Sequence, residues 1–199
     1  MKIVCLPLGA YQTNTYIVYE EGASRCLIID PGYEPEQITR YLSQLRLEPE
    51  AILLTHGHFD HVGAVRPLVA DFDCDVYMND RETTMPPIMT AGKLYYTHSY
   101  DEGDTLTLAG LTFTVLATPG HTPGSVCLDF GQHLFTGDTL FAGSCGRTDL
   151  PGGDIRQLKK SLARLARLEK PCFIHAGHGG GSYLGKEKQD NPYLRGGLL

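Results

Sequence analysis

Four potential metal ligands lie within six residues in the first half of the chain. The segment THGHFDH (55–61) contains His56, His58, Asp60 and His61, and it directly follows a predicted strand. In an extended or looped backbone, residues two positions apart point to the same side, so His56 and His58 can share one ion. Asp60 and His61 then face another direction and can serve a second ion. Imidazole nitrogen with some carboxylate oxygen suits zinc, and also iron or manganese.

Three further potential ligands lie at the ends of predicted strands later in the chain. His121 is in a Pro/Gly turn, Asp138 ends the segment LFTGD, and His178 follows the strand around CFI. Together with the first cluster they offer two sets of three ligands, with the Asp138 carboxylate available as a bridge. Structural zinc sites are closed by four protein ligands and favour cysteine, whereas catalytic sites keep a position open. The pattern therefore predicts an open, catalytic binuclear site.

Short strands and a few amphipathic helices must position these residues. Apolar residues at helical spacing predict a helix over 35–46, a two-turn helix over 62–69 and a last helix that begins after the capping residue Asp154. Residues 79–101 are the least regular stretch and are expected to form a loop or short helix over a pocket. The last helix has an apolar stripe of Ile155, Leu158, Leu162, Leu165 and Leu168. Strands are predicted at 14–20, 25–30, 50–55, 75–78, 105–108, 112–117, 125–130 and 133–138.

The composition is that of an ordinary globular protein. With 199 residues, 42% hydrophobic and 20% charged, we expect one domain over residues 1–199 and exclude a disordered chain or a coiled coil. No apolar run approaches the ~20 residues of a membrane span, so no membrane partner is expected. The net charge of −6 argues against nucleic acid. Six cysteines without a CxxC pair indicate reduced thiols in a cytoplasmic protein. The oligomeric state stays open.

The motif HGHFDH, followed by His121, by Asp138 in TGDTLF and by His178, resembles the metallo-β-lactamase superfamily. The similarity extends over essentially the whole chain and is closest to the glyoxalase II-like hydrolases, the hydroxyacylglutathione hydrolases. It implies an α+β fold, a four-layer αββα sandwich with the metals in a cleft at one edge of the two sheets.

The resemblance also implies a division of the ligands between two metals. One metal would take His56, His58 and His121, and the second would take Asp60, His61 and His178, with Asp138 bridging them. Asp30 in IIDPG matches a family aspartate that supports the metal loop from behind the ligands. β-Lactamases of this fold usually have cysteine at the position of Asp138. The loop FAGSCGRTDLPGGD (141–154) resembles a loop of short glyoxalase II-like proteins and of persulfide dioxygenases.

We therefore expect a thioesterase of the glyoxalase II type that acts through a metal-bridging hydroxide. Coordination lowers the pKa of water from 15.7 to around 7. Asp60 and Asp138 are the expected catalytic carboxylates, with two divalent ions as cofactors, zinc before iron or manganese. The positive charge of two divalent cations exceeds the negative charge of Asp60, Asp138 and one hydroxide. The expected substrate is therefore a small anionic thioester. Arg147 is expected to bind its anionic end, with a structural pair to Asp149 as the alternative.

Other functions remain open at this point. The first alternative is a mononuclear iron persulfide dioxygenase that uses only His56, His121 and Asp138. The second alternative is a hydrolase of another ester or of a lactone, which would use the same hydroxide. The third is a non-catalytic metal-binding module, which would need no open coordination position on the metal. Metal analysis with an oxygen-uptake assay separates the dioxygenase from the hydrolases. The remaining histidines, of which His98 is the best candidate to line the pocket, are expected to be ordinary.

Overall fold

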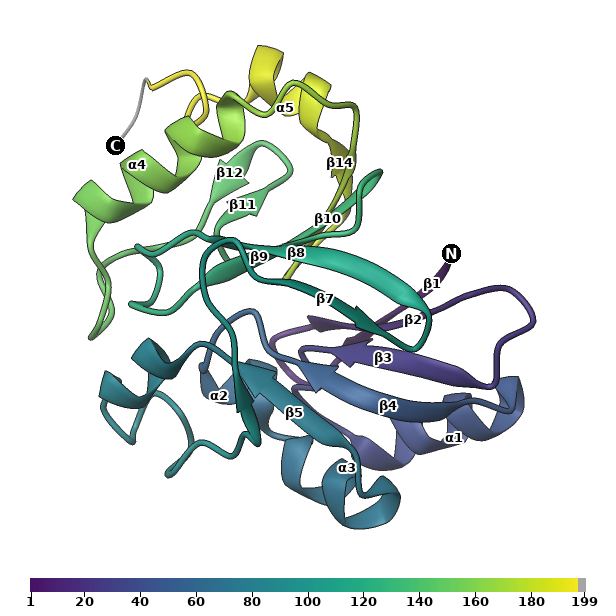
Figure 1. Cartoon of the computed structure of the whole chain (residues 1–199). Helices are drawn as coiled ribbons and strands as arrows, with labels where there is room; N and C mark the ends of the chain where they lie inside the picture. The colour runs from purple at the N-terminus through teal and green to yellow at the C-terminus, as the bar shows by residue number, and fades with distance from the viewer. Residues whose placement is uncertain (197–199) are drawn as a thin grey trace.

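Two six-stranded sheets form the centre of the computed structural model, which describes residues 1–196 (Figure 1). The first sheet is built from the N-terminal half of the chain, and its strands neighbour one another in chain order. Its first three strands are antiparallel and the rest run parallel. They are β1 (Lys2–Leu8), β2 (Thr13–Tyr19), β3 (Arg25–Ile29), β4 (Glu48–Leu53), β5 (Asp75–Met78) and β6 (His98–Ser99).

The second sheet follows in the chain and has the order β14-β13-β10-β9-β8-β7. Only β10 and β13 are parallel neighbours, so their carboxyl ends lie at the same edge. A small hairpin of β11 (Leu140–Phe141) and β12 (Ser144–Cys145) leaves the sheet after β10. The sheet strands are β7 (Thr105–Leu108), β8 (Leu111–Ala117), β9 (Val126–Asp129), β10 (His133–Gly137), β13 (Phe173–Ala176) and β14 (Ser182–Tyr183).

Helices cover the outer faces of both sheets, as Figure 1 shows, and complete a four-layer αββα sandwich. The first sheet is covered by α1 (Pro35–Leu45) and α3 (Val65–Phe72). The second is covered by α4 (Ile155–Ala166) and α5 (Leu184–Asp190). The short α2 (Phe59–Val62) and the 3-10 helix η1 (Asp80–Thr84) lie in connections. The fold implied by the family resemblance is confirmed.

Three apolar layers separate the four structural layers, and the period-two alternation of strands distributes residues between them. Ile52 of β4 packs into the layer under α1, whereas the next residue, Leu53, packs between the sheets. Phe113 and Phe135 meet Leu53 in that central layer. The third layer lies under α4 and includes Leu158. Because β4 is buried on both faces, its carboxyl end is rigidly placed at the sheet edge.

Several sequence predictions need correction. The helix predicted over 62–69 is two helices, because the chain turns at Gly63 between α2 and α3. Ile155 is exposed, and α4 ends before Leu168. The helix after Asp154 is also not the last, since the polar segment Leu184–Asp190 forms α5. Among the described residues, no helix combines the length and apolar character needed to cross a membrane.

Candidate metal centre

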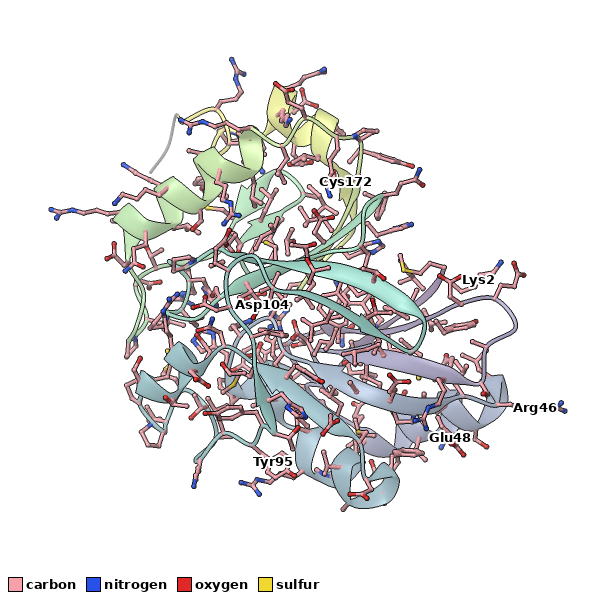
Figure 2. The ribbon with its side chains drawn as sticks, viewed as in Figure 1. Lys2, Arg46, Glu48, Tyr95, Asp104 and Cys172 are labelled. Carbon is pink, nitrogen blue, oxygen red and sulfur yellow. The ribbon has the colours of Figure 1, made fainter. Side chains whose placement is uncertain are left out.

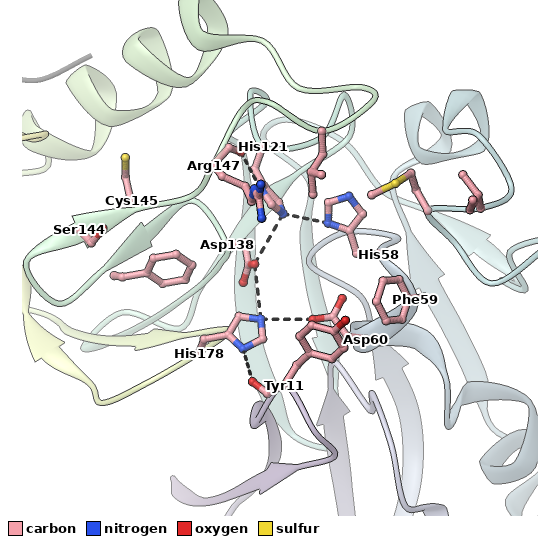
Figure 3. A pocket seen from close by; sticks show the side chains of 14 residues that line it. Tyr11, His58, Phe59, Asp60, His121, Asp138, Ser144, Cys145, Arg147 and His178 are labelled. Carbon is pink, nitrogen blue, oxygen red and sulfur yellow. Dashed lines mark hydrogen bonds and ion pairs between the residues drawn. The ribbon is translucent and has the colours of Figure 1, made fainter.

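The seven predicted ligands come together at one edge of the sandwich, where loops from both sheets meet. The loop after β4 contributes His56, His58, Asp60 and His61 from the first sheet. The second sheet contributes His121 from the β8–β9 connection, Asp138 from the end of β10 and His178 from the end of β13. Figure 3 shows most of the seven residues around one cleft.

The ligands form two groups of three that match the sets implied by the family resemblance. In the first, His58 Nδ1 lies 2.9 Å from His121 Nε2, and His56 completes the group. In the second, His178 Nε2 lies 3.3 Å from His61 Nε2 and 3.3 Å from Asp60 Oδ2. Within each group, one donor atom from every residue lies within 4.8 Å of the others.

Asp138 lies between the two groups. Its Oδ2 is 3.5 Å from His121 Nε2 of the first group and 3.5 Å from His178 Nε2 of the second. Its Oδ1 is 3.5 Å from His61 Nε2. The carboxylate thus faces both groups at once, which is the position a bridging ligand needs.

The residues fit a pair of divalent cations. Buried polar atoms in folded proteins almost always have a hydrogen-bond partner. Among residues 1–196, the buried atoms His56 Nε2, His58 Nε2 and Asp138 Oδ1 have none. His56 Nε2 and Asp138 Oδ1 belong to side chains that face the ligand groups, so bound cations would satisfy them. The donors are nitrogen and carboxylate oxygen without sulfur, a set that suits zinc, iron or manganese.

Four of the histidines are oriented by hydrogen bonds from their second ring nitrogen. Each Nδ1–H donates to an oxygen, which leaves the Nε2 lone pair directed at the ligand cluster. Such partners fix both the tautomer and the ring orientation. The pairs are His56 with Thr55 Oγ1 at 3.1 Å, His61 with Asp30 Oδ2 at 3.0 Å, His121 with the Arg147 carbonyl at 2.8 Å and His178 with the Tyr11 carbonyl at 3.0 Å.

Asp30 supports the metal loop, as the resemblance implied for this position. It is buried directly after β3, with a left-handed backbone at φ 49°. Its Oδ1 accepts the Thr55 N–H at 2.7 Å, and its Oδ2 accepts the Thr55 hydroxyl at 2.6 Å. The same Oδ2 accepts His61 Nδ1–H. Through Thr55 and His61, one carboxylate orients ligands of both groups.

Electrostatics keep His58 and Asp60 in forms that can bind a cation, and they hold a proton on His61. Burial, with His121 and His61 nearby, lowers the pKa of His58 to about 4, so its ring is neutral at physiological pH. Burial opposes ionisation of Asp60, but hydrogen bonding to His178 and the charge of His61 lower its pKa to about 2. Burial also disfavours charge on His61, yet Asp138 and Asp30 raise its pKa to about 9. A cation would replace the proton that those carboxylates attract.

Glu82 is a buried carboxylate that sequence reasoning missed. It lies in η1, and its two oxygens accept the backbone N–H groups of Gly57 and Gly124, each at 2.6 Å. Gly57 separates His56 from His58, and Gly124 lies three residues after His121. A Cβ atom at Gly57 would lie 3.0 Å from Glu82 Oε2, and one at Gly124 would lie 2.8 Å from Oε1. Glycine at both positions therefore lets one carboxylate join the two loops.

A cavity of about 660 Å³ opens directly above the ligands. Arg147 lines it, and its guanidinium also forms a two-point ion pair with Asp149, with both N···O distances at 2.7 Å. Arg147 thus borders the pocket and forms the Asp149 pair named as the alternative, and its contact with a substrate stays a prediction. The lining residues are Tyr11, His58, Phe59, Asp60, Ile88, Met89, His121, Asp138, Phe141, Ser144, Cys145, Arg147, Leu150 and His178.

Comparison with known proteins places this geometry in a family. A family model described as "Metallo-beta-lactamase superfamily" matches residues 8–178. The chain belongs to the metallo-β-lactamase superfamily. Hydroxyacylglutathione hydrolase GloC of Haemophilus influenzae is 36% identical over 98% of this chain and 98% of its own.

Two solved structures of the superfamily are similar throughout. The crystal structure of the B3 metallo-β-lactamase BLEG-1 has a TM-score of 0.90 and 36% identity, and covers 97% of this chain and 99% of its own. A di-iron-bound form of TTHA1623 has a TM-score of 0.84 and 40% identity, over 96% of this chain and 99% of its own. These matches assign the metallo-β-lactamase fold and its metal-binding character to this chain.

The remaining histidines lie outside the cleft. His98 stacks on Tyr77 with ring centroids 4.8 Å apart and pairs with Asp75, so it does not line the pocket. His133 Nδ1 and His175 Nε2 are 2.9 Å apart, a hydrogen-bonded pair on β10 and β13. These contacts agree with their assignment as ordinary histidines of the superfamily scaffold.

Proposed function

We propose that this metallo-β-lactamase superfamily member is a binuclear hydrolase of thioesters, of the hydroxyacylglutathione hydrolase type. The observation behind the proposal is the position of Asp138, which faces two complete three-ligand groups that open into one cavity. Because every ligand is nitrogen or carboxylate oxygen, we propose zinc, with iron or manganese as alternatives. The resemblance to GloC over nearly the whole chain supports thioester hydrolysis.

Hydrolysis would convert a thioester and water into a carboxylic acid and a thiol. Two divalent ions at the centre would supply a water of lowered pKa and an electrophile for the carbonyl oxygen. Asp60 borders the cavity, where its carboxylate can accept a hydrogen bond from the attacking water. Asp138 faces both ligand groups, where its carboxylate would hold the two ions together. We further propose that Arg147 contacts an anionic end of the substrate at the cavity mouth.

A substrate panel tests this proposal. Protein loaded with zinc, iron or manganese is assayed on S-lactoylglutathione, a lactone and a β-lactam, beside the same protein after chelation. We expect thiol release from the thioester that disappears on chelation and returns with metal. Because Asp138 occupies the position where lactamases of the fold usually have cysteine, we expect no efficient β-lactam turnover. Efficient lactam hydrolysis without thioesterase activity would reject the proposal.

A second candidate is a mononuclear iron persulfide dioxygenase that uses His56, His121 and Asp138 as its ligands. All three lie together at the centre. The similar TTHA1623, solved in a di-iron-bound form, supports iron as a metal for this fold, although with two ions and not one. We also propose a cytoplasmic location, since all six cysteines are free and four of them are buried.

A further inference from the structure

Four apolar side chains form one wall of the cavity beside the metal ligands. This apolar rim consists of Tyr11, Phe59, Ile88 and Met89. Ile88 is 83% exposed and Tyr11 is 59% exposed. Transfer of such large apolar side chains out of water is favourable, so a ligand that covers them would be stabilised. In Figure 3, Phe59 lies on one side of the ligand cluster and Cys145 lies on the other.

Backbone contacts fix the rim relative to the metal ligands. The carbonyl of Tyr11 accepts the Nδ1–H of His178 at 3.0 Å. Phe59 directly follows His58, and its N–H donates to the carbonyl of Met89 at 2.8 Å. The rings of Tyr11 and Phe59 meet edge to face with centroids 5.5 Å apart. The rim is therefore a continuous surface next to the reacting position.

The cavity offers little to a substrate with several negative charges. Among the described residues, Arg147 is the only lysine or arginine that lines it. The Nε–H and one Nη2–H of its guanidinium already donate to Asp149, whose carboxylate offsets the positive charge. A carrier with several carboxylates would find only this guanidinium as a cationic side chain of the lining. An apolar substituent, in contrast, would cover the exposed rim.

We infer that the thioester hydrolysed here carries an apolar substituent that binds on the rim formed by Tyr11, Phe59, Ile88 and Met89. This inference rests on the proposed function and narrows its substrate class. A cavity of about 660 Å³ suits a ligand far larger than an acetyl or lactoyl group. The substituent can belong to the acyl group or to the thiol, and the experiment distinguishes the two.

Two thioester series test the inference with the metal-loaded protein. One lengthens the acyl chain from about two to eight carbons on a constant thiol, and the other lengthens an alkyl thiol on a constant acetyl group. Each buried methylene contributes roughly fourfold. We therefore expect kcat/KM to rise at least about tenfold along one series, which identifies the side that binds the rim. Calorimetry with non-hydrolysable alkyl thioethers of the same lengths should give the same order of affinities.

Substitutions test whether the rim causes the increase in kcat/KM with chain length. Ile88→Ser should reduce the ratio of kcat/KM between the longest and shortest substrates by about tenfold, and Ile88→Leu should retain it. Ile155→Ser is the matched control, because Ile155 is also exposed but lies on α4 and not in the cavity. Thioester hydrolysis that is independent of chain length in both series would overturn this inference alone. If no thioester is hydrolysed and no thioether binds, both this inference and the proposed function are overturned.

Discussion

At the scale of single residues, the centre depends on how each ligand atom is directed. Four imidazoles donate their Nδ1–H to oxygen atoms of Thr55, Asp30, Arg147 and Tyr11. Their Nε2 atoms are consequently left as acceptors for a cation. The Oδ1 atom of Asp138 has no hydrogen-bond partner, and the carboxylate faces both ligand groups. It is therefore the residue whose loss should affect both ions.

Replacement of Asp138 by alanine should lower the metal content from two ions per chain to one or none. We expect activity to fall by more than about 100-fold, since even partners behind the ligands contribute about 10- to 100-fold. Elemental analysis and a thioester assay measure the two effects. Asp71→Ala removes the same charge from the exposed face of α3 and should retain both metals. Full metal content in the Asp138 variant would refute the binuclear assignment.

Arg147→Ala should raise KM for an anionic thioester by about 10- to 150-fold with little change in kcat. A hydrogen bond to a charged group contributes roughly 1.5–3 kcal/mol, and equal loss in the ground and transition states appears in KM. Thermal stability should hardly change, because exposed ion pairs such as Arg147–Asp149 contribute little. Arg156→Ala, on the exposed surface of α4, is the control. Equal losses on a neutral thioester, or marked destabilisation, would identify Arg147 as structural.

At the scale of elements, the site depends on loops from two sheets that must stay fixed relative to one another. Glu82 in η1 joins the loop after β4 to the loop between β8 and β9 through Gly57 and Gly124. Burial raises the pKa of this carboxyl, and hydrogen bonding to Thr122, Gly57 and Gly124 offsets only part of that rise. We regard Glu82 as a positioning residue for His56, His58 and His121.

Glu82→Gln should weaken metal binding about 10- to 100-fold, because an amide N–H must then face a backbone N–H of one of the two loops. Competition with a chromophoric chelator measures this affinity. Glu187→Gln is a matched control, since Glu187 is also buried and accepts the Gly143 N–H, on the hairpin after β10. Both variants should lower the melting temperature. A metal affinity equal to wild type in the Glu82 variant would show that the carboxylate only stabilises the fold.

Where a local pattern carried the information, the sequence predicted well most strands and the residues that gather at the cleft. HGHFDH contains four ligands in one loop, and apolar runs such as 50–55 mark buried strands. The elements it missed have weak local patterns: β1 contains Pro7, and α5 is short and polar. Glu82 was missed because its role follows from contacts with residues 25 and 42 positions away. The backbone carbonyls that orient histidines likewise have no side-chain signature.

At the scale of the whole molecule, the metal centre connects the two halves of the sandwich. Asp60 and its neighbours follow β4 of the first sheet, whereas Asp138 and His178 follow strands of the second. Ions held by both would bind only the folded chain. Binding to the native state alone stabilises it by about 2.7 kcal/mol when free metal exceeds Kd by 100-fold.

Chelation should therefore lower the melting temperature by roughly 5–10 °C, since 1 kcal/mol corresponds to about 2–4 °C at this chain length. Calorimetry with and without chelator measures the shift, and added zinc should restore it. The Asp138→Ala variant should show a smaller shift because it retains fewer ions. An identical melting temperature in the loaded and chelated protein would indicate that the ligands do not join the sheets through a metal.

The most direct test of the proposed activity follows thiol release and dissolved oxygen in the same cell. Metal-loaded protein is mixed with a thioester, and then with glutathione persulfide, in a cell fitted with an oxygen electrode. A binuclear hydrolase releases thiol from the thioester and consumes no oxygen with either substrate. Oxygen uptake with the persulfide, together with no thiol release from any thioester, would contradict the account and favour the iron dioxygenase.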